Sequence, residues 1–263
     1  MIPIKEMESS AKQWIREAGQ RIIASFTTKI NIQAKSNPND LVTNIDKETE
    51  EFFIGKIKER YPGHRILGEE GMGDEVRDLK GVVWIIDPID GTLNFIHQQR
   101  NFAISIGVFE DGIGKFGMVY DVVLDELYHA VKGEGVFLND VPLSKLTDGK
   151  LEESIVSLNA SWVTENKRID HQVLAPLVHD VRGMRSYGSA ALELAYVAAG
   201  RLDVYITMRL APWDFAGGVL LVEEAGGEVS NVYGEELDFI DGGSLFVSRP
   251  GLHEVILNRY MNK

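Results

Sequence analysis

The stretch VVWIIDPIDGTLNF, residues 82–95, joins an apolar run to a turn rich in polar residues. Val82–Ile86 is continuously apolar, too short for a helix and rich in branched and aromatic residues, which indicates a buried strand. Pro88 has no amide hydrogen, so we expect the strand to end before it. Leu93–Gln98 then begins a short helix.

Two carboxylates, Asp87 and Asp90, are therefore predicted on a tight turn, where they can converge on one cation. Gly91 allows a ligand to approach the backbone closely, and the amides of Gly91 and Thr92 would open the helix, which favours phosphate. Asp-Pro and Asp-Gly pairs also occur in ordinary turns. A buried strand that runs into two acids and a threonine is a costly arrangement for a plain turn, which favours a functional site.

Two segments before this stretch also supply acidic residues. In ILGEEG (66–71), a short apolar strand leads to Glu69 and Glu70, which is also the pattern of a polar turn. In LVTNID (41–46), Asp46 lies near the start of a helix. There, an N-cap or a first-turn acid stabilised by the helix dipole is the simpler interpretation.

A further acid lies in RLAPWDFAGGVLLVEEAGG (209–227), which predicts a helix from residue 212. Pro212 suits the first helical turn, and Asp214 in that turn is kept ionised by the helix dipole. Gly217 and Gly218 lower the helix propensity, so we expect another backbone to pack closely against them. Trp213 is expected in the core.

The rest of the chain alternates between helical and strand patterns. We predict helices over 4–28, 45–61, 168–180, 189–199, 212–225 and 251–261, and strands over 155–159, 182–186, 202–207, 227–231 and 245–248. Between 103 and 139, the pattern predicts an antiparallel sheet, from AISIGVFE through an Asp-Gly turn and FGMVYDVV to ELYHAV and GVFLN. KSNPND (35–40) is typical of an exposed, mobile loop.

The polar segment PLSKLTDGKLEES (142–154) marks a predicted domain boundary. Residues 1–142 form an N-terminal α+β domain with antiparallel strands, and this domain carries most of the acidic motifs. Residues 143–263 alternate between strands and helices, which predicts a C-terminal α/β domain that completes the active site.

Composition and charge limit the partners of the chain. Its 263 residues include 27 Lys and Arg against 40 Asp and Glu, a formal net charge of −13. This field repels nucleic acid and anionic membranes, so we expect neither as a partner. An anionic substrate would need a local reversal of sign, which a cluster of divalent metals supplies.

The chain has no cysteine, which excludes disulfides, thiolate zinc sites, iron–sulfur clusters and thiol nucleophiles. This composition fits a cytoplasmic protein. The first residues, MIPIKEMESS, include acids and no apolar stretch, so we expect no signal peptide. The chain contains no P-loop and no GxSxG elbow, and the three-residue spacing of Asp87 and Asp90 argues against an aspartyl-phosphate DxD motif.

The segments GEEG, WIIDPIDGTLNF and APWDFAGG, in this order and at these separations, resemble the inositol monophosphatase family. The resemblance extends over nearly the whole chain, including KSNPNDLVTNID and YGSAALELAYVAAGRLDVY. It implies a five-layered αβαβα sandwich, a homodimer, and a Mg2+-dependent, Li+-sensitive phosphatase that acts on a small-molecule phosphate ester.

The resemblance also implies roles for individual residues. The implied metal ligands are Glu69, Asp87, the carbonyl of Ile89, Asp90 and Asp214; the implied catalytic residues are Glu69, Thr92 and Asp46. Substrate contacts are implied for Asp90, Gly91, Thr92, Gly188, Ser189 and Ala190. Lys35 matches the lysine of the family's mobile loop.

These ligands lead to an expected mechanism. Oxygen-only ligands select a hard cation, so we expect two Mg2+ ions per site, with a weaker third near Glu69 left open. One ion would acidify a water and the other would stabilise the leaving oxygen, with Asp87 between them. We expect in-line attack without a covalent intermediate.

The substrate end departs from the family pattern at two positions. Thr207 replaces a glutamate that binds a ring hydroxyl in inositol-preferring animal members, and Arg209 replaces a glycine. We therefore expect hydrolysis of inositol monophosphate or related sugar and polyol phosphates, with a fructose-1,6-bisphosphatase or an NADP(H) or nucleotide phosphatase as alternatives. Arg209 either pairs with a nearby carboxylate or a dimer partner, or binds a second anionic group of the substrate. A non-catalytic binding protein that kept the fold is the alternative from another functional class.

Overall fold

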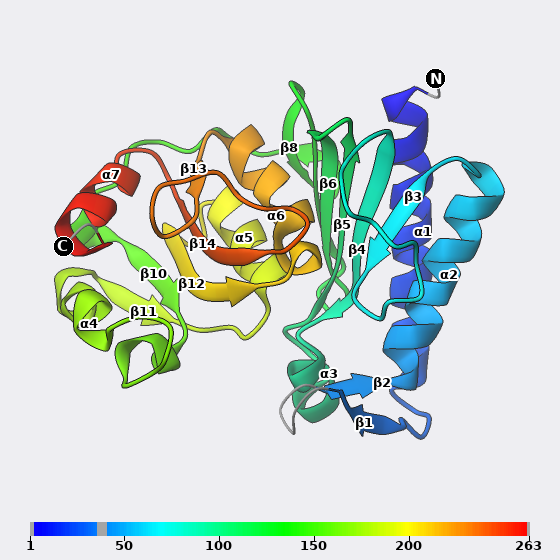
Figure 1. Cartoon of the computed structure of the whole chain (residues 1–263), viewed down its shortest axis with the longest axis horizontal. Helices are drawn as coiled ribbons and strands as arrows, with labels where there is room; N and C mark the ends of the chain where they lie inside the picture. Colours follow the sequence, from blue (N-terminus) through cyan, green and yellow to red (C-terminus); the bar gives the residue numbers. More distant parts are fainter. Residues whose placement is uncertain (1–2, 36–40, 262–263) are drawn as a thin grey trace.

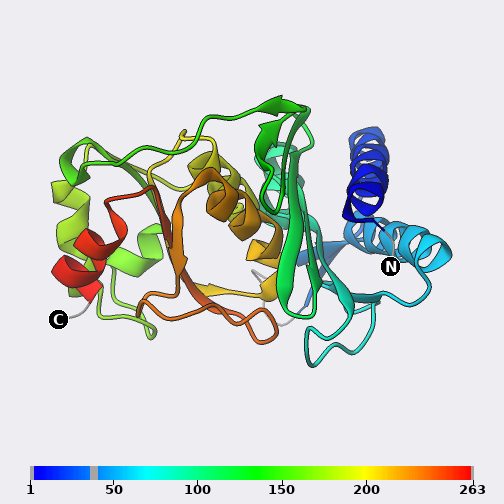
Figure 2. The ribbon, with the colours of Figure 1, turned by 90° about the horizontal axis from the view of Figure 1, so that it is seen from above.

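The computed structural model describes residues 3–35 and 41–261. Five layers follow one another along its longest axis (Figure 1): helices α1 and α2, a seven-stranded sheet, helices α5 and α6, a five-stranded sheet, and an outer layer with α4 and α7. Figure 2 shows the same succession from above. The predicted five-layered αβαβα sandwich is therefore confirmed. The predicted loop 35–40 lies outside the described residues except for Lys35.

The helices of the described ranges are α1 (Ile4–Ser25), α2 (Asn44–Arg60), α3 (Thr92–Gln98), α4 (His171–Asp180), α5 (Ala190–Ala198), α6 (Pro212–Ala225) and α7 (His253–Ile256). Short 3-10 turns occupy η1 (Leu151–Glu153) and η2 (Ala160–Val163), and a π-helical turn, η3 (Leu257–Met261), follows α7. The helix predicted over 251–261 is thus an α-helical turn followed by a π-helical one. Within these ranges, no helix combines the length and hydropathy needed to cross a membrane.

The first sheet has the strand order β3-β4-β5-β6-β7-β8-β9. Its members are β3 (Arg65–Gly68), β4 (Val82–Asp90), β5 (Ala103–Glu110), β6 (Ile113–Asp121), β7 (Glu126–Val131), β8 (Gly135–Leu138) and β9 (Val141–Pro142). Only β3 and β4 run parallel; the later pairs are antiparallel, as the hairpin pattern predicts.

The second sheet has the order β11-β10-β12-β14-β13. It contains β10 (Ile155–Leu158), β11 (Gly183–Arg185), β12 (Val204–Leu210), β13 (Glu228–Ser230) and β14 (Gly243–Ser248). Strands β10, β11 and β12 are parallel, whereas β14 is antiparallel to both neighbours. A separate antiparallel pair, β1 (Ile32–Ala34) and β2 (Leu41–Thr43), was not predicted because each strand has only three residues.

Strand β4 continues through Pro88, contrary to the prediction that the strand ends there. Asp87 pairs with Ser105 and Asp90 with Ala103, so two residues of β4 face one residue of β5. This extra residue is a β-bulge, which accommodates a proline that a regular ladder would not. Paired residues share a face of the sheet and side chains alternate along β5, so the bulge places both aspartates on one face.

That face carries helix α6, which lies very close to the sheet. A methyl group on Gly217 would lie 2.7 Å from the Ile106 carbonyl oxygen, and one on Gly218 would lie 2.5 Å from the Leu194 Cβ. The expectation that another backbone packs against this glycine pair is therefore confirmed for Gly217, while Gly218 meets a side chain. Trp213 is only half-buried, at the edge of the core.

Candidate active site

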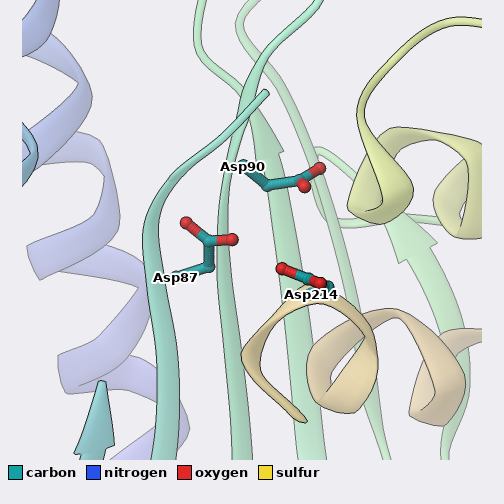
Figure 3. Close-up of side chains that lie close together, drawn as sticks. All are labelled: Asp87, Asp90 and Asp214. Carbon is teal, nitrogen blue, oxygen red and sulfur yellow. The ribbon is translucent and has the colours of Figure 1, made fainter. Parts of the chain in front are cut away.

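Three aspartates converge between the two halves of the chain (Figure 3). Asp87 and Asp90 come from the bulged end of β4, and Asp214 comes from the first turn of α6. Each offers a carboxylate oxygen, and these oxygens all lie within 4.8 Å of one another. Asp87 and Asp90 are buried, whereas Asp214 remains partly exposed. Such a group of oxygens can hold a divalent cation.

The electrostatics of this aspartate cluster favour a positive ligand. Burial raises the pKa of Asp87 well above its usual range, and the charges of Glu69, Asp90 and Asp214 raise it further. Burial also raises the pKa of Asp90 to about 7, and it raises that of Asp214 strongly. Like charges at close range resist ionisation, so a cation among them would favour the charged forms.

Backbone and hydroxyl donors hold each aspartate in place. The Asp87 carboxylate accepts the Ile89 amide at 2.9 Å, and that of Asp214 accepts the Ala211 amide at 2.8 Å. Asp90 accepts the Ala191 amide at 2.8 Å and the hydroxyl of Ser189, the N-cap of α5. The orientation of the cluster is therefore set by the starts of α5 and α6 as well as by β4.

Asp46 and Thr92 lie beside this cluster. The Thr92 hydroxyl is 3.1 Å from an Asp46 carboxylate oxygen and 3.1 Å from the Ile89 carbonyl oxygen. The other Asp46 oxygen accepts the amide and hydroxyl of Thr43 in a capping box at the start of α2. Asp46 thus fulfils the first-turn role that its position indicates and also reaches Thr92, a contact between residues 46 positions apart.

The turn after β3 carries Glu69 and Glu70, and Lys35 binds both. The Lys35 ammonium lies 2.9 Å from a Glu69 carboxylate oxygen and 2.7 Å from one of Glu70. Burial raises the pKa of Glu70 to about 7. Sequence reasoning missed Glu50 on α2, whose carboxylate accepts the amides of Glu70 and Met72.

A cavity of about 240 Å3 opens beside the cluster. It is lined by Asp90, Asn159, Trp162, Ser186, Gly188, Ser189, Ala190, Glu193, Tyr205, Thr207, Arg209, Leu210 and Asp214. The predicted segment 188–190 therefore meets Asp90 and Asp214 at one cavity. Gly91 has φ of +94°, and a methyl group there would lie 3.3 Å from the Gly188 carbonyl oxygen, so this position favours glycine.

Two further residues of this cavity differ in their surroundings. Glu193, which sequence reasoning also missed, is buried and accepts the Ser157 hydroxyl at 2.9 Å and the Tyr187 amide at 2.7 Å. Arg209 is exposed, and in the described part of the chain no carboxylate lies within 4.0 Å of its guanidinium. The expected pairing of Arg209 with a nearby carboxylate of its own chain is thus not found among these residues.

An acidic cluster that could hold a metal ion thus lies beside a polar cavity in a layered sandwich of helices and sheets. The family model described as the inositol monophosphatase family matches residues 4–262, and the chain belongs to this family of phosphatases. A curated relative, the inositol-1-monophosphatase of Bacillus subtilis (strain 168), is 61% identical over 257 residues, which cover 98% of this chain and 97% of the relative. The chain is therefore an enzyme that hydrolyses phosphoric monoesters.

Solved structures agree with this assignment. The inositol monophosphate complex of the Staphylococcus aureus inositol monophosphatase II has a TM-score of 0.88 and 45% sequence identity, covering 98% of this chain and 94% of that chain. An inositol monophosphatase/NADP phosphatase complexed with Mg2+ and phosphate has a TM-score of 0.89 and 27% identity, covering 97% and 95%.

Proposed function

We propose that this enzyme is a Mg2+-dependent phosphomonoesterase that hydrolyses inositol monophosphate or related sugar and polyol phosphates by metal-activated attack of water. The convergence of Asp87, Asp90 and Asp214 within 4.8 Å carries this proposal. The names of the Bacillus and Staphylococcus relatives support the substrate class, and the Mg2+ and phosphate complex of the NADP phosphatase supports the metal.

The donor set fits a hard divalent cation, because every proposed ligand atom is an oxygen. We assign one Mg2+ to Glu69, Asp87 and the Ile89 carbonyl, and a second to Asp87, Asp90 and Asp214; a weaker third would lie near Glu69. Bound Mg2+ would neutralise the phosphate and lower the pKa of a water. The three closely spaced aspartates would repel an anionic substrate until a cation binds among them.

Thr92 and Asp46 would orient the attacking water. The Thr92 hydroxyl has a single proton, so it donates either to Asp46 or to the Ile89 carbonyl. When it donates to Asp46, its oxygen remains free to accept a hydrogen bond from the water. Glu69, on the turn after β3, would take the proton of that water as a general base.

The substrate would be held from both halves of the chain. We assign its phosphate to the amides of Gly91 and Thr92, and its hydroxyls to Asp90 and the segment Gly188, Ser189 and Ala190. Lys35 would contribute charge beside Glu69. In this division, residues 1–142 form a domain that supplies most metal ligands, and residues 143–263 form a domain that adds Asp214 and the substrate segment.

Family membership supports three further proposals: a homodimer, a cytoplasmic location and inhibition by Li+. Sedimentation velocity of the purified protein measures the first. Cell fractionation measures the second, and phosphate release at increasing LiCl measures the third.

Arg209 favours a second candidate function, hydrolysis of substrates with two anionic groups, such as fructose 1,6-bisphosphate or NADP(H). Its guanidinium lines the cavity without an ion pair to any described residue. The NADP phosphatase among the similar structures supports this possibility.

Phosphate release from a panel of inositol 1-phosphate, fructose 1,6-bisphosphate and NADP, with and without Mg2+, tests both functions. We expect Mg2+-dependent release from inositol 1-phosphate. No release from any of these esters would contradict the proposed substrate class, and release only from the bisphosphate or NADP would favour the second candidate.

A further inference from the structure

Helix α2 carries a second buried carboxylate, Glu50, one turn after Asp46. Its side chain is fully buried, and among residues 3–35 and 41–261 no Lys or Arg lies within 4.0 Å of its oxygens. A buried carboxylate without a cationic partner is costly unless hydrogen bonds compensate for the lost water. Here one oxygen accepts the Glu70 amide at 2.7 Å and the other accepts the Met72 amide at 2.9 Å.

The backbone after β3 closes tightly over this carboxylate. A methyl group on Gly68 would lie 2.5 Å from the carboxyl carbon of Glu50, so the end of β3 has no room for a side chain there. Gly68, Glu70 and Met72 therefore all meet the Glu50 carboxylate. Glu69 lies between them. Gly68 pairs with Ile86 in the parallel ladder of β3 and β4, so the next residues, Glu69 and Asp87, leave neighbouring strands side by side.

One helix face thus reaches two loops of the site. Asp46 and Glu50 are four residues apart, so they lie on the same face of α2. Asp46 binds Thr92 after β4, and Glu50 binds the turn after β3. Helix α2 is itself fixed to the core by the fully buried side chains of Phe53 and Ile57.

We propose that Glu50 is a positioning residue, whose carboxylate sets the place of Glu69 relative to Asp87 and thereby sets the affinity of the site for Mg2+. This inference rests on the proposed metal site. If Glu50 only stabilised the fold, its loss would lower the melting temperature without changing metal affinity. A positioning role changes the metal affinity as well, because Glu69 would no longer be held beside Asp87.

The test is Mg2+ binding to metal-free protein by isothermal titration calorimetry, with wild type, Glu50→Gln and Glu50→Asp. The glutamine keeps one acceptor oxygen and places an NH2 group against a backbone amide. We expect Glu50→Gln to bind Mg2+ about 10–100-fold more weakly. We expect kcat at saturating Mg2+ to fall as well, because Glu69 is also the proposed general base. Glu50→Asp keeps both oxygens on a shorter side chain, so we expect its Mg2+ affinity to lie between those of wild type and Glu50→Gln. This second variant keeps the test available if the glutamine variant does not fold.

Asp203→Asn is the matched control. In the wild type, the Asp203 carboxylate also accepts a backbone amide, that of Ile155 at 2.7 Å. It pairs with Arg249 at 2.7 Å, and all three residues lie in the second half of the chain. We expect this variant to melt at a lower temperature with unchanged Mg2+ affinity. Amide hydrogen exchange of metal-free protein gives an independent readout, because Glu50→Gln should speed exchange at Glu70 and Met72.

Faster exchange at Glu70 and Met72 combined with wild-type Mg2+ affinity in both Glu50 variants would overturn the positioning role and leave the proposed function intact. An equal loss of affinity in Asp203→Asn would also overturn it, because the effect would then follow general destabilisation. A wild-type protein that binds no Mg2+ would instead overturn the proposed function, and the inference with it.

Discussion

The aspartate cluster and the exposed side of the adjoining cavity that carries Arg209, here called the outer wall, are built differently. Asp90 is buried and accepts two donors from the start of α5, whereas Arg209, on the same cavity, is exposed and has no ion pair with any described residue. A backbone amide holds each carboxylate of the cluster, whereas no carboxylate of the described residues holds the Arg209 guanidinium. We infer that the chemistry depends on the whole fold and that substrate choice depends on a few replaceable side chains.

The two regions also differ in charge. The cluster concentrates carboxylates whose pKa values burial raises, and a cation among them would favour their ionised forms. The outer wall offers the positive charge of Arg209, which partly counteracts the rise in the pKa of Asp214. Perturbing the cluster should therefore affect every substrate, and perturbing Arg209 should affect only some.

Removal of the metal should have the largest effect. We expect EDTA to abolish phosphate release from every substrate and Mg2+ to restore it, because the empty cluster repels an anionic ligand. The measurement is phosphate release at a fixed substrate concentration before and after chelation. Full activity in excess chelator would show that the cluster does not act through a metal.

Asp87→Asn should have the next largest effect, because Asp87 is the proposed ligand common to both ions. The loss of a bridging carboxylate should cost several kcal/mol, so kcat/KM should fall at least about 100-fold for all substrates alike. Circular dichroism serves as the control, since a change at the end of β4 leaves the core intact. A variant that keeps more than about a tenth of the activity would contradict the two-metal assignment.

Arg209→Ala should separate the outer wall from the cluster. If the guanidinium binds a second phosphate, kcat/KM for fructose 1,6-bisphosphate should fall. The lost transition-state stabilisation should be about 1.5–3 kcal/mol, the contribution of a charged hydrogen bond. The value for inositol 1-phosphate should stay nearly constant. Equal losses on both substrates, or none on either, would assign Arg209 a structural role.

The smallest expected effect is a pH dependence of stability. Asp90 has a pKa of about 7 in the folded metal-free protein against an ordinary value of 3.8, so between these values the folded state holds more protons than the unfolded one. The stability of the metal-free protein should therefore fall as pH rises through 7. Mg2+ pairs with the ionised forms, so the rise in melting temperature that Mg2+ causes should be larger at pH 8 than at pH 6. Each additional kcal/mol of unfolding free energy corresponds to a rise of roughly 2–4 °C.

Differential scanning calorimetry with and without Mg2+ at both pH values makes this measurement. Burial lowers the pKa of His253 to about 4, which contributes an opposite trend below pH 6.5. His253 lies on α7, in the outer layer beyond the second sheet (Figure 1), so its contribution cancels when the two metal conditions are compared. An equal Mg2+ effect at pH 6 and pH 8 would contradict the prediction.

The sequence predicted those parts of the fold that depend on local patterns. The apolar run before Asp87, the proline and glycines around Asp214 and the antiparallel pattern after residue 103 each arise from nearby residues, and the structure contains the corresponding elements. Only the family resemblance predicted the convergence of the three aspartates. Local sequence patterns do not reveal that residue 214 lies beside residue 87.

What the sequence could not reveal depends on tertiary contacts. Glu50 lies among Glu48 and Glu51 on an acidic helix, and only the turn after β3, packed against it, distinguishes its buried carboxylate from its neighbours. The two three-residue strands β1 and β2 carry too few residues for a periodic signal. The roles of individual site residues remain predictions, to be tested as described above.

The bulge in β4 has a consequence for how this site tolerates insertions and deletions. In an alternating strand, residues three positions apart face opposite sides, and one extra residue brings Asp87 and Asp90 to the same side. Removing a single residue between them would restore a regular ladder with both aspartates still on one face, but it would also remove the proposed carbonyl ligand or its proline neighbour. The extra residue thus acts as a frameshift within the strand, which makes room for a carbonyl group between two acids that still face the same side.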